Sequence, residues 1–135
     1  MTNHDAALEL TDIVFPEHAN HYGTLFGGNA LLLMSKAAFL AARAFAGSDV
    51  VMARCGDARF LAPVPVGSVL RLRAWVSRVG RSSLTVRVDG TAQQPGREPR
   101  PVLESLRQPL EDGVVSVARV GGTRSSPHGS GSSRR

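Results

Sequence analysis

Two hydrophobic patterns, one of helical and one of strand period, organise most of the chain. The segment from Phe26 to Ala46 is rich in Ala, Leu and Met, which are strong helix formers. Asn29, Lys36 and Arg43 recur every seven residues, so they fall on one narrow stripe. Gly47 is a plausible helix end. A helix that is apolar nearly all round is typical of a buried position, so the pattern predicts a buried helix.

Strand-like segments surround this helix in the sequence. Leu8 to Phe15 reads as a short strand, and Val50 to Phe60 as an extended segment interrupted by a glycine. Val69 to Val79 and Ser83 to Asp89 alternate apolar and polar residues, and the Gly-Arg pair between them suits a turn. These two segments predict an antiparallel hairpin with one buried face.

One long apolar helix with several antiparallel strands predicts an α+β fold. The helix has too little polar surface to lie in water, so we expect the sheet to wrap around it.

The pattern weakens towards the C-terminus. Residues 91–101 contain three prolines and no apolar periodicity, and residues 102–110 are ambiguous. Val114 to Val120 predicts one more strand. We expect residues 1–120 to form one domain and residues 121–135, which are rich in Ser, Gly and Arg, to be a disordered tail.

Composition is consistent with a single folded domain: 135 residues, of which 42% are apolar. One cysteine, Cys55, forms no disulfide framework and no CxxC metal or redox motif. A reducing compartment, and so a cytoplasmic location, fits best. The polar N-terminus does not resemble a secretory signal, and no run of about 18 apolar residues predicts a membrane span.

The net charge of +5 raises the question of nucleic-acid binding. Residues 91–135 carry +3 of this charge and residues 1–90 carry +2. The basic residues of the main segment are scattered, and only seven residues are aromatic. Proteins that stack on bases need aromatic side chains beside basic ones, so we do not expect a nucleic-acid partner.

Three segments carry a resemblance to a known family. The stretch from Phe15 to Asn29 reads FPEHANHYGTLFGGN, Phe60 to Gly67 reads FLAPVPVG, and Val79 to Ser83 reads VGRSS. In this order and spacing they resemble the loop and helix start, the strand connector and the hairpin turn of hotdog-fold acyl-CoA thioesterases. The resemblance covers roughly residues 8 to 90.

This resemblance implies a curved antiparallel sheet around one central helix, and protomers that pair edge to edge into a homodimer or a higher homo-oligomer. It implies hydrolysis of a fatty acyl-CoA or similar thioester to the free acid and CoA. Coenzyme A is then part of the substrate, and no other cofactor and no metal is implied. The family also has a final long strand. Here Val114 to Val120 is either a diverged remnant of it or part of a reading-frame disruption in an Arg-rich chain, which has 15 Arg and one Lys.

Thioester hydrolysis needs donors for the carbonyl oxygen, because negative charge develops there. The resemblance places that oxygen at the amides of Gly27 and Gly28, where a helix N-terminus points N–H groups outward. It makes Gly28 catalytic, and Gly27 and Asn29 substrate-binding. The alternative is a Gly-Gly turn that merely starts the helix. Asn20 matches a loop asparagine that positions water or substrate, and its alternative role is turn stabilisation.

Ser35 stands where the family keeps an acidic base, since the chain reads Met-Ser-Lys-Ala-Ala where the family has Met-Asp-Lys-Ala-Ala. A hydroxyl is too weak a base to activate water unaided. It could act as a nucleophile if His18 or His21 served as its base, or it could simply bond to the carbonyl four residues back. Asp57 is a candidate substitute carboxylate, and surface solvation is its alternative.

Arg81, Ser82 and Ser83 match the family's CoA-contact turn, and arginine suits phosphate. A solvated hairpin turn is the other interpretation. Taken together, the sequence predicts a thioesterase-like protein with impaired catalysis. The alternatives are a non-catalytic acyl-CoA-binding paralogue or partner subunit of a hotdog oligomer, and a truncated product that folds poorly.

Overall fold

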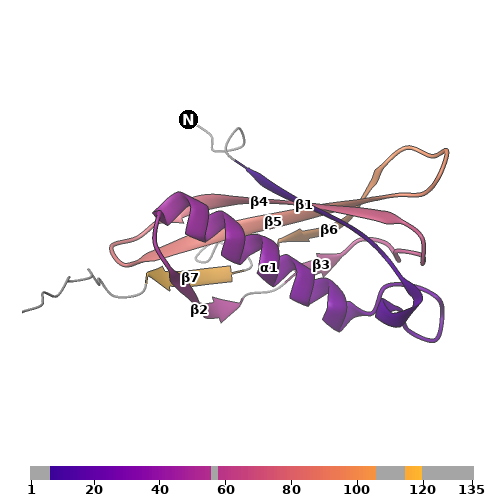
Figure 1. Ribbon diagram of the computed structural model, residues 1–135, viewed down its shortest axis with the longest axis horizontal. Coiled ribbons are helices and arrows are strands. Elements are labelled where there is room, and N and C mark those ends of the chain that lie inside the picture. The colour runs from indigo at the N-terminus through magenta and orange to yellow at the C-terminus, as the bar shows by residue number, and fades with distance from the viewer. Residues whose placement is uncertain (1–6, 56–57, 106–114, 120–135) are drawn as a thin grey trace, which may run out of the picture.

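The computed structural model describes residues 7–55, 58–105 and 115–119, which form a long helix packed on an antiparallel sheet of seven strands (Figure 1). The elements in chain order are β1 (Leu8–Ile13), the short 3-10 helix η2 (Pro16–His18), α1 (Gly27–Ala46), β2 (Val50–Cys55), β3 (Ala58–Phe60), β4 (Val69–Val79), β5 (Ser83–Gln93), β6 (Arg100–Ser105) and β7 (Val115–Arg119). Asp57 and the predicted tail, residues 121–135, lie outside the described residues.

The helix lies where the sequence predicted it. It ends at Gly47, which adopts the left-handed conformation with φ 67° and donates its N–H to the Arg43 carbonyl at 3.0 Å. Glycine suits this position because it has no Cβ to oppose a positive φ. By length and composition α1 would also pass as a membrane span, but core helices of soluble proteins pass the same test.

The sheet order is β1-β4-β5-β6-β3, with β2 and β7 attached beside the first half of β5. The two halves of β5 pair with different strands: residues 83–86 with β7, and residues 89–92 with β6. The same division continues outward, because β7 pairs with β2 and β6 pairs with β3. Two successive short strands therefore occupy the place of the single long final strand that the family resemblance implies.

The core lies between α1 and the inner face of the sheet. Alternate residues of β4 and β5 point inward and are buried, as their period of two predicted. The helix contributes a face of small residues. The buried core residues of these elements are Ala30, Met34, Ala37, Ala38, Ala41 and Ala42 from α1, with Leu70, Leu72, Ala74, Val76, Leu84, Val86, Val88 and Ala92 from the strands. The predicted α+β class, one helix against an antiparallel sheet, is confirmed.

The C-terminal strands were only partly predicted. The strand expected to end at Asp89 continues to Gln93, and β6 begins in the stretch without apolar periodicity and continues into the stretch that was ambiguous. Gly90 and Ala92 hide the alternation because both are small. Gly90 needs to be small: a Cβ there would lie 2.7 Å from Leu72 Cδ2. The predicted strand at residues 114–120 is present as β7.

Within the single chain the predicted burial of the helix is only partial. The sheet covers one side of α1 and leaves the rest open. The large apolar residues that this exposes are Leu31, Leu32, Leu40 and Phe45, which are 38%, 55%, 39% and 48% exposed. A single sheet can contact only one side of a helix. The apolar pattern of the sequence therefore includes residues that this chain does not itself cover.

Candidate functional site

The loop between β1 and α1 is held by its own hydrogen bonds. The Oδ1 atom of Asn20 accepts from the Tyr22 N–H at 2.9 Å, from the Thr24 N–H at 3.2 Å and from the Thr24 hydroxyl at 3.2 Å. The Asn20 N–H in turn donates to the Thr24 carbonyl at 2.8 Å. These contacts place Asn20 in the turn-stabilising role that was its alternative interpretation, with its oxygen turned into the loop.

The helix begins without a side-chain cap. Phe26 is the N-cap residue and makes no side-chain capping bond, and the first turn holds no acidic residue. Gly27 and Gly28 are the first two helical positions, whose N–H groups have no partner inside a helix. A helix start of this kind keeps backbone donors available to an acceptor from outside.

Both glycines lie beside aromatic rings. A Cβ on Gly28 would lie 2.7 Å from the Phe26 ring, so only glycine fits without moving that ring. A Cβ on Gly27 would lie 4.0 Å from Phe60 Cζ, which is an ordinary contact. Phe26 and Phe60 are each about half exposed, at 54% and 50%. The sequence analysis did not single out either ring, although an aromatic residue beside a Gly-Gly pair is a signal that could have been used.

An apolar groove of about 390 Å³ borders Gly27. Its walls come from the helix start, from β3 and from the connector that follows β3, and its floor includes β6. The residues that line it are Leu25, Gly27, Ala30, Phe60, Leu61, Ala62, Pro63, Val64 and Leu103. None of these side chains carries a charge or a polar group, so the groove suits an alkyl chain better than a polar ligand.

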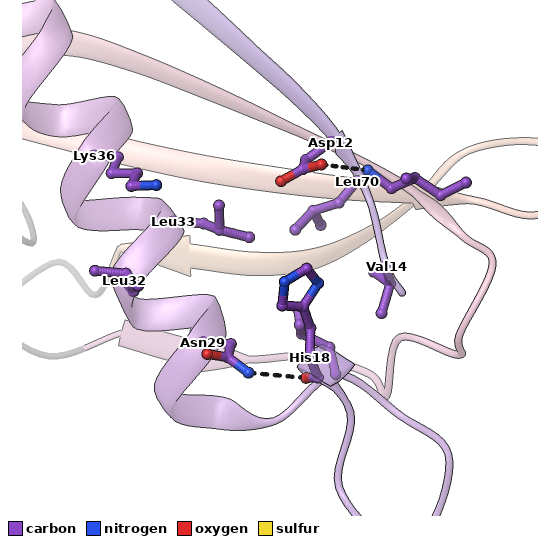
Figure 2. A pocket seen from close by; sticks show the side chains of 10 residues that line it. Asp12, Val14, His18, Asn29, Leu32, Leu33, Lys36 and Leu70 are labelled. Atoms are coloured by element: carbon purple, nitrogen blue, oxygen red, sulfur yellow. Dashed lines mark hydrogen bonds between the residues drawn. The ribbon is translucent and has the colours of Figure 1, made fainter. Parts of the chain in front are cut away.

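A second and smaller pocket, of about 110 Å³, lies on the other side of the helix, between α1 and β1 (Figure 2). Asp12, His18, Asn29 and Lys36 bring polar groups to its apolar walls, and Figure 2 shows the His18 ring pointing into it. Asp12 pairs in register with Leu70, so it lies on the inward side of the sheet. The alternation of Leu8, Leu10 and Asp12 could have predicted that placement.

Ser35 is half-buried on the same stripe of α1 as Gly28, two turns further along. His18 lines the pocket beside Asn29 and Lys36, and Ser35 is not part of that pocket. His21 stacks against Tyr22, with ring centroids 4.0 Å apart. Among the hydrogen bonds of the described residues, none joins Ser35 to His18 or His21. The structure therefore does not support a Ser35-His nucleophile within one chain.

Two members of the polar stripe of the helix face solvent. Lys36 and Arg43 are both exposed, and Arg43 Nε lies 3.3 Å from the Asp49 carboxylate. Asn29, the first member of the stripe, instead turns its amide towards the loop and donates to the His18 carbonyl at 3.1 Å (Figure 2).

The predicted CoA-contact turn lies far from the glycines within one chain. Arg81 and Ser82 are exposed and Ser83 is half-buried, and the Gly80 N–H donates to the Ser83 carbonyl at 2.7 Å. This turn is at the end of the sheet where α1 ends, whereas Gly27 and Gly28 are at the opposite end of the helix (Figure 1). A single chain therefore does not join the two parts of the predicted site.

Comparisons with known proteins agree with this architecture. A family model described as the thioesterase superfamily matches residues 22–98, more than half of the chain. An uncharacterized acyl-CoA thioester hydrolase from Zymomonas mobilis is 37% identical over 78 residues, which are 58% of this chain and 52% of that protein. The chain thus spans about half the length of this curated relative.

Solved structures show the same fold. An acyl-CoA hydrolase from Agrobacterium tumefaciens superposes with a TM-score of 0.76 at 31% identity, over 85% of this chain and 43% of that one. An acyl-CoA hydrolase from Staphylococcus aureus, solved with butyryl coenzyme A and coenzyme A, gives 0.75 at 25% identity over 85% and 66%. A hexameric thioesterase from Yersinia pestis gives 0.73 at 26% identity over 89% and 94%.

The hotdog fold predicted from the sequence is therefore confirmed by structures that share most of this chain's length. Together with the family model that matches residues 22–98, these structures establish that the chain belongs to the thioesterase superfamily.

Proposed function

We propose that this protein binds acyl-CoA thioesters and hydrolyses them slowly, with the thioester oxygen at the helix N-terminus and the acyl chain in the apolar groove. The observation that carries the proposal is the uncapped start of α1 at Gly27 and Gly28, directly beside a groove without polar side chains. The names of the relatives, which are acyl-CoA hydrolases and thioester hydrolases, support the same substrate class.

In this reaction water attacks the carbonyl carbon, the C–S bond breaks, and the products are the free acid and the thiol of CoA. Negative charge builds on the carbonyl oxygen before the C–S bond breaks. The amides of Gly27 and Gly28 are placed to donate to that oxygen, and such donors are commonly worth about 10²–10³ in rate each. The helix dipole adds to their effect.

The weak step is the activation of water. At Ser35 the chain has a hydroxyl in place of the carboxylate that the family resemblance predicts, and a positioned general base contributes about 10²–10⁴-fold. Slow turnover follows if nothing replaces it. The second candidate function, a non-catalytic acyl-CoA binder or partner subunit, is favoured by this same substitution, because the groove and the helix start are intact without the base.

Release of free CoA from a panel of acyl-CoAs, measured with a thiol reagent, tests the proposal. We expect slow turnover by the wild type and a gain of about 10²–10⁴-fold in kcat for Ser35→Asp. Ser35→Ala is the matched control and should stay at the wild-type level. If the wild type binds acyl-CoA but releases no CoA from it, whereas Ser35→Asp does release CoA, the binding function is the better description. Failure of all three proteins to bind or hydrolyse any acyl-CoA rules out both functions.

We further propose that the functional unit is a homodimer or a larger homo-oligomer. The single chain leaves the large apolar residues Leu31, Leu32, Leu40 and Phe45 of α1 more than a third exposed, and contact with a second copy would cover apolar surface of this kind. A second copy would also be the source of the Arg81, Ser82 and Ser83 turn, which one chain holds away from its own Gly27 and Gly28. The Yersinia pestis thioesterase is a hexamer, which supports assembly of copies in this family.

A further inference from the structure

The carbonyl of His18 accepts two hydrogen bonds at the start of α1. The Phe26 N–H donates to it at 2.9 Å, and the Asn29 amide Nδ2 donates to it at 3.1 Å (Figure 2). Phe26 is the N-cap and Asn29 is the third helical residue, so the two donors lie on either side of Gly27 and Gly28. The His18 carbonyl thus ties the loop to the helix across the two glycines.

Asn29 differs from the usual side chain at this helical position. A Glu or Gln there commonly reaches back as an acceptor for the N-cap N–H. Asn29 acts as a donor instead, and its acceptor is a carbonyl of the loop eleven residues earlier. The N-terminal amides are left without a capping side chain, while the helix start is still fixed in place.

We infer that Asn29 is a positioning residue: its bond to the His18 carbonyl holds the first turn of α1 so that the Gly27 and Gly28 amides are fixed for a thioester oxygen. This inference rests on the proposed function, and it changes the role expected for Asn29 from substrate contact to support. The arrangement selects for a donor. An aspartate would suit the helix dipole better but cannot donate to a carbonyl.

Asn29→Asp is therefore the critical variant, because it keeps the shape of the side chain and removes the donor. We expect kcat to fall about tenfold or more, since small displacements of catalytic groups have large effects on rate, while KM changes less than about threefold. The melting temperature should stay level or rise, because the new carboxylate favours the helix N-terminus. A purely structural role would lower the melting temperature and kcat together.

Two further variants serve as a rescue and a control for the effect of Asn29→Asp on kcat. Asn29→Gln keeps a donor amide and should recover much of the lost kcat. Gln93→Glu is the matched control, because the Gln93 Nε2 also donates to a backbone carbonyl, that of Arg97 at 2.9 Å, in a turn far along the sequence. It should leave kcat unchanged. The turnover of each Asn29 and Gln93 variant is measured in the wild-type chain and again in a chain that also carries Ser35→Asp.

Amide NMR of the full chain tests the positioning role of Asn29 separately from the proposed function. In Asn29→Asp, the amide resonances of Gly27 and Gly28 should shift and the Phe26 amide should exchange faster with solvent, whereas Gln93→Glu should change none of them. If no protein hydrolyses acyl-CoA but these amides respond, the proposed function fails and the positioning contact stands. If the amides do not respond to Asn29→Asp, or if kcat is unchanged by Asn29→Asp in a protein that does hydrolyse acyl-CoA, the inference is overturned.

Discussion

The side of α1 that packs on the sheet and the surface that the chain leaves exposed carry apolar residues of different size, and the exposed surface also carries Lys36 and Arg43. The side against the sheet carries five alanines and Met34, all buried. The remaining surface carries larger apolar residues: Leu31, Leu32, Leu40 and Phe45 are each more than a third exposed. Hydropathy alone assigns both sides to a protein interior, whereas residue size separates them.

Size has a direct physical meaning here. Small side chains let the helix backbone approach the strands closely, and the gap is then filled by the larger residues of β4 and β5. Large apolar side chains that the chain leaves exposed gain free energy when another surface covers them. The comparison teaches that, in this helix, the fully buried contact with the sheet is made mainly by alanine, whereas the single chain leaves Leu31, Leu32, Leu40 and Phe45 exposed.

The largest expected effect is on the alanine side. Ala38 is 0% exposed, so Ala38→Glu would bury a carboxylate among apolar neighbours. We expect a loss of more than about 4 kcal/mol, enough to abolish cooperative unfolding by circular dichroism. Ala44→Glu on the exposed side of the same helix is the control and should stay within about 0.5 kcal/mol. Equal losses in the two variants would contradict the assignment of the faces.

A middle-sized effect compares one large residue from each side. Met34→Ala leaves a cavity in the core and should lower the free energy of unfolding by about 2–5 kcal/mol, measured in urea. Leu32 is 55% exposed, so Leu32→Ala should cost less at protein concentrations where the chain is monomeric. A loss for Leu32→Ala as large as that for Met34→Ala under those conditions would show that this chain itself covers the outer side.

The smallest effect on folding is expected for the double variant Leu32→Glu and Leu40→Glu. Both residues are exposed in the single chain, so its own stability should change by about 1 kcal/mol or less. Association of copies should weaken strongly, because two charges would enter an apolar contact. Sedimentation velocity should show an oligomer for the wild type and a monomer for the variant. A variant that stays oligomeric would place the contact elsewhere.

Local patterns predicted the elements whose side chains vary sharply in polarity. The hairpin of β4 and β5 was predicted because Leu70, Leu72 and Val76 alternate with arginine, tryptophan and serine. β6 was not predicted, because Pro101 and the neighbouring arginine conceal the buried Val102 and Leu103. The identity of those two core residues depends on pairing with β5, which is a contact distant in sequence.

The candidate site divides in the same way. Gly27 and Gly28 were proposed from the sequence because they match the helix start of the family that the chain resembles, and because glycine lets a ligand approach the backbone closely. The donation from Asn29 to His18 and the inward placement of Asp12 were not found. Each depends on how a loop or an edge strand folds back on the helix.

The sequence by itself determined the helix, its glycine start and end, and the central hairpin. These follow from residue type and short-range period, which act within a few residues of backbone. The tertiary structure alone decided which side of α1 meets the sheet, that Asn20 and Asn29 bond to the loop, and that the Arg81 turn lies at the far end from Gly27. Such relations depend on packing between distant segments. Hydrophobic periodicity does not distinguish small from large apolar residues, although residue size decides how closely two elements can approach.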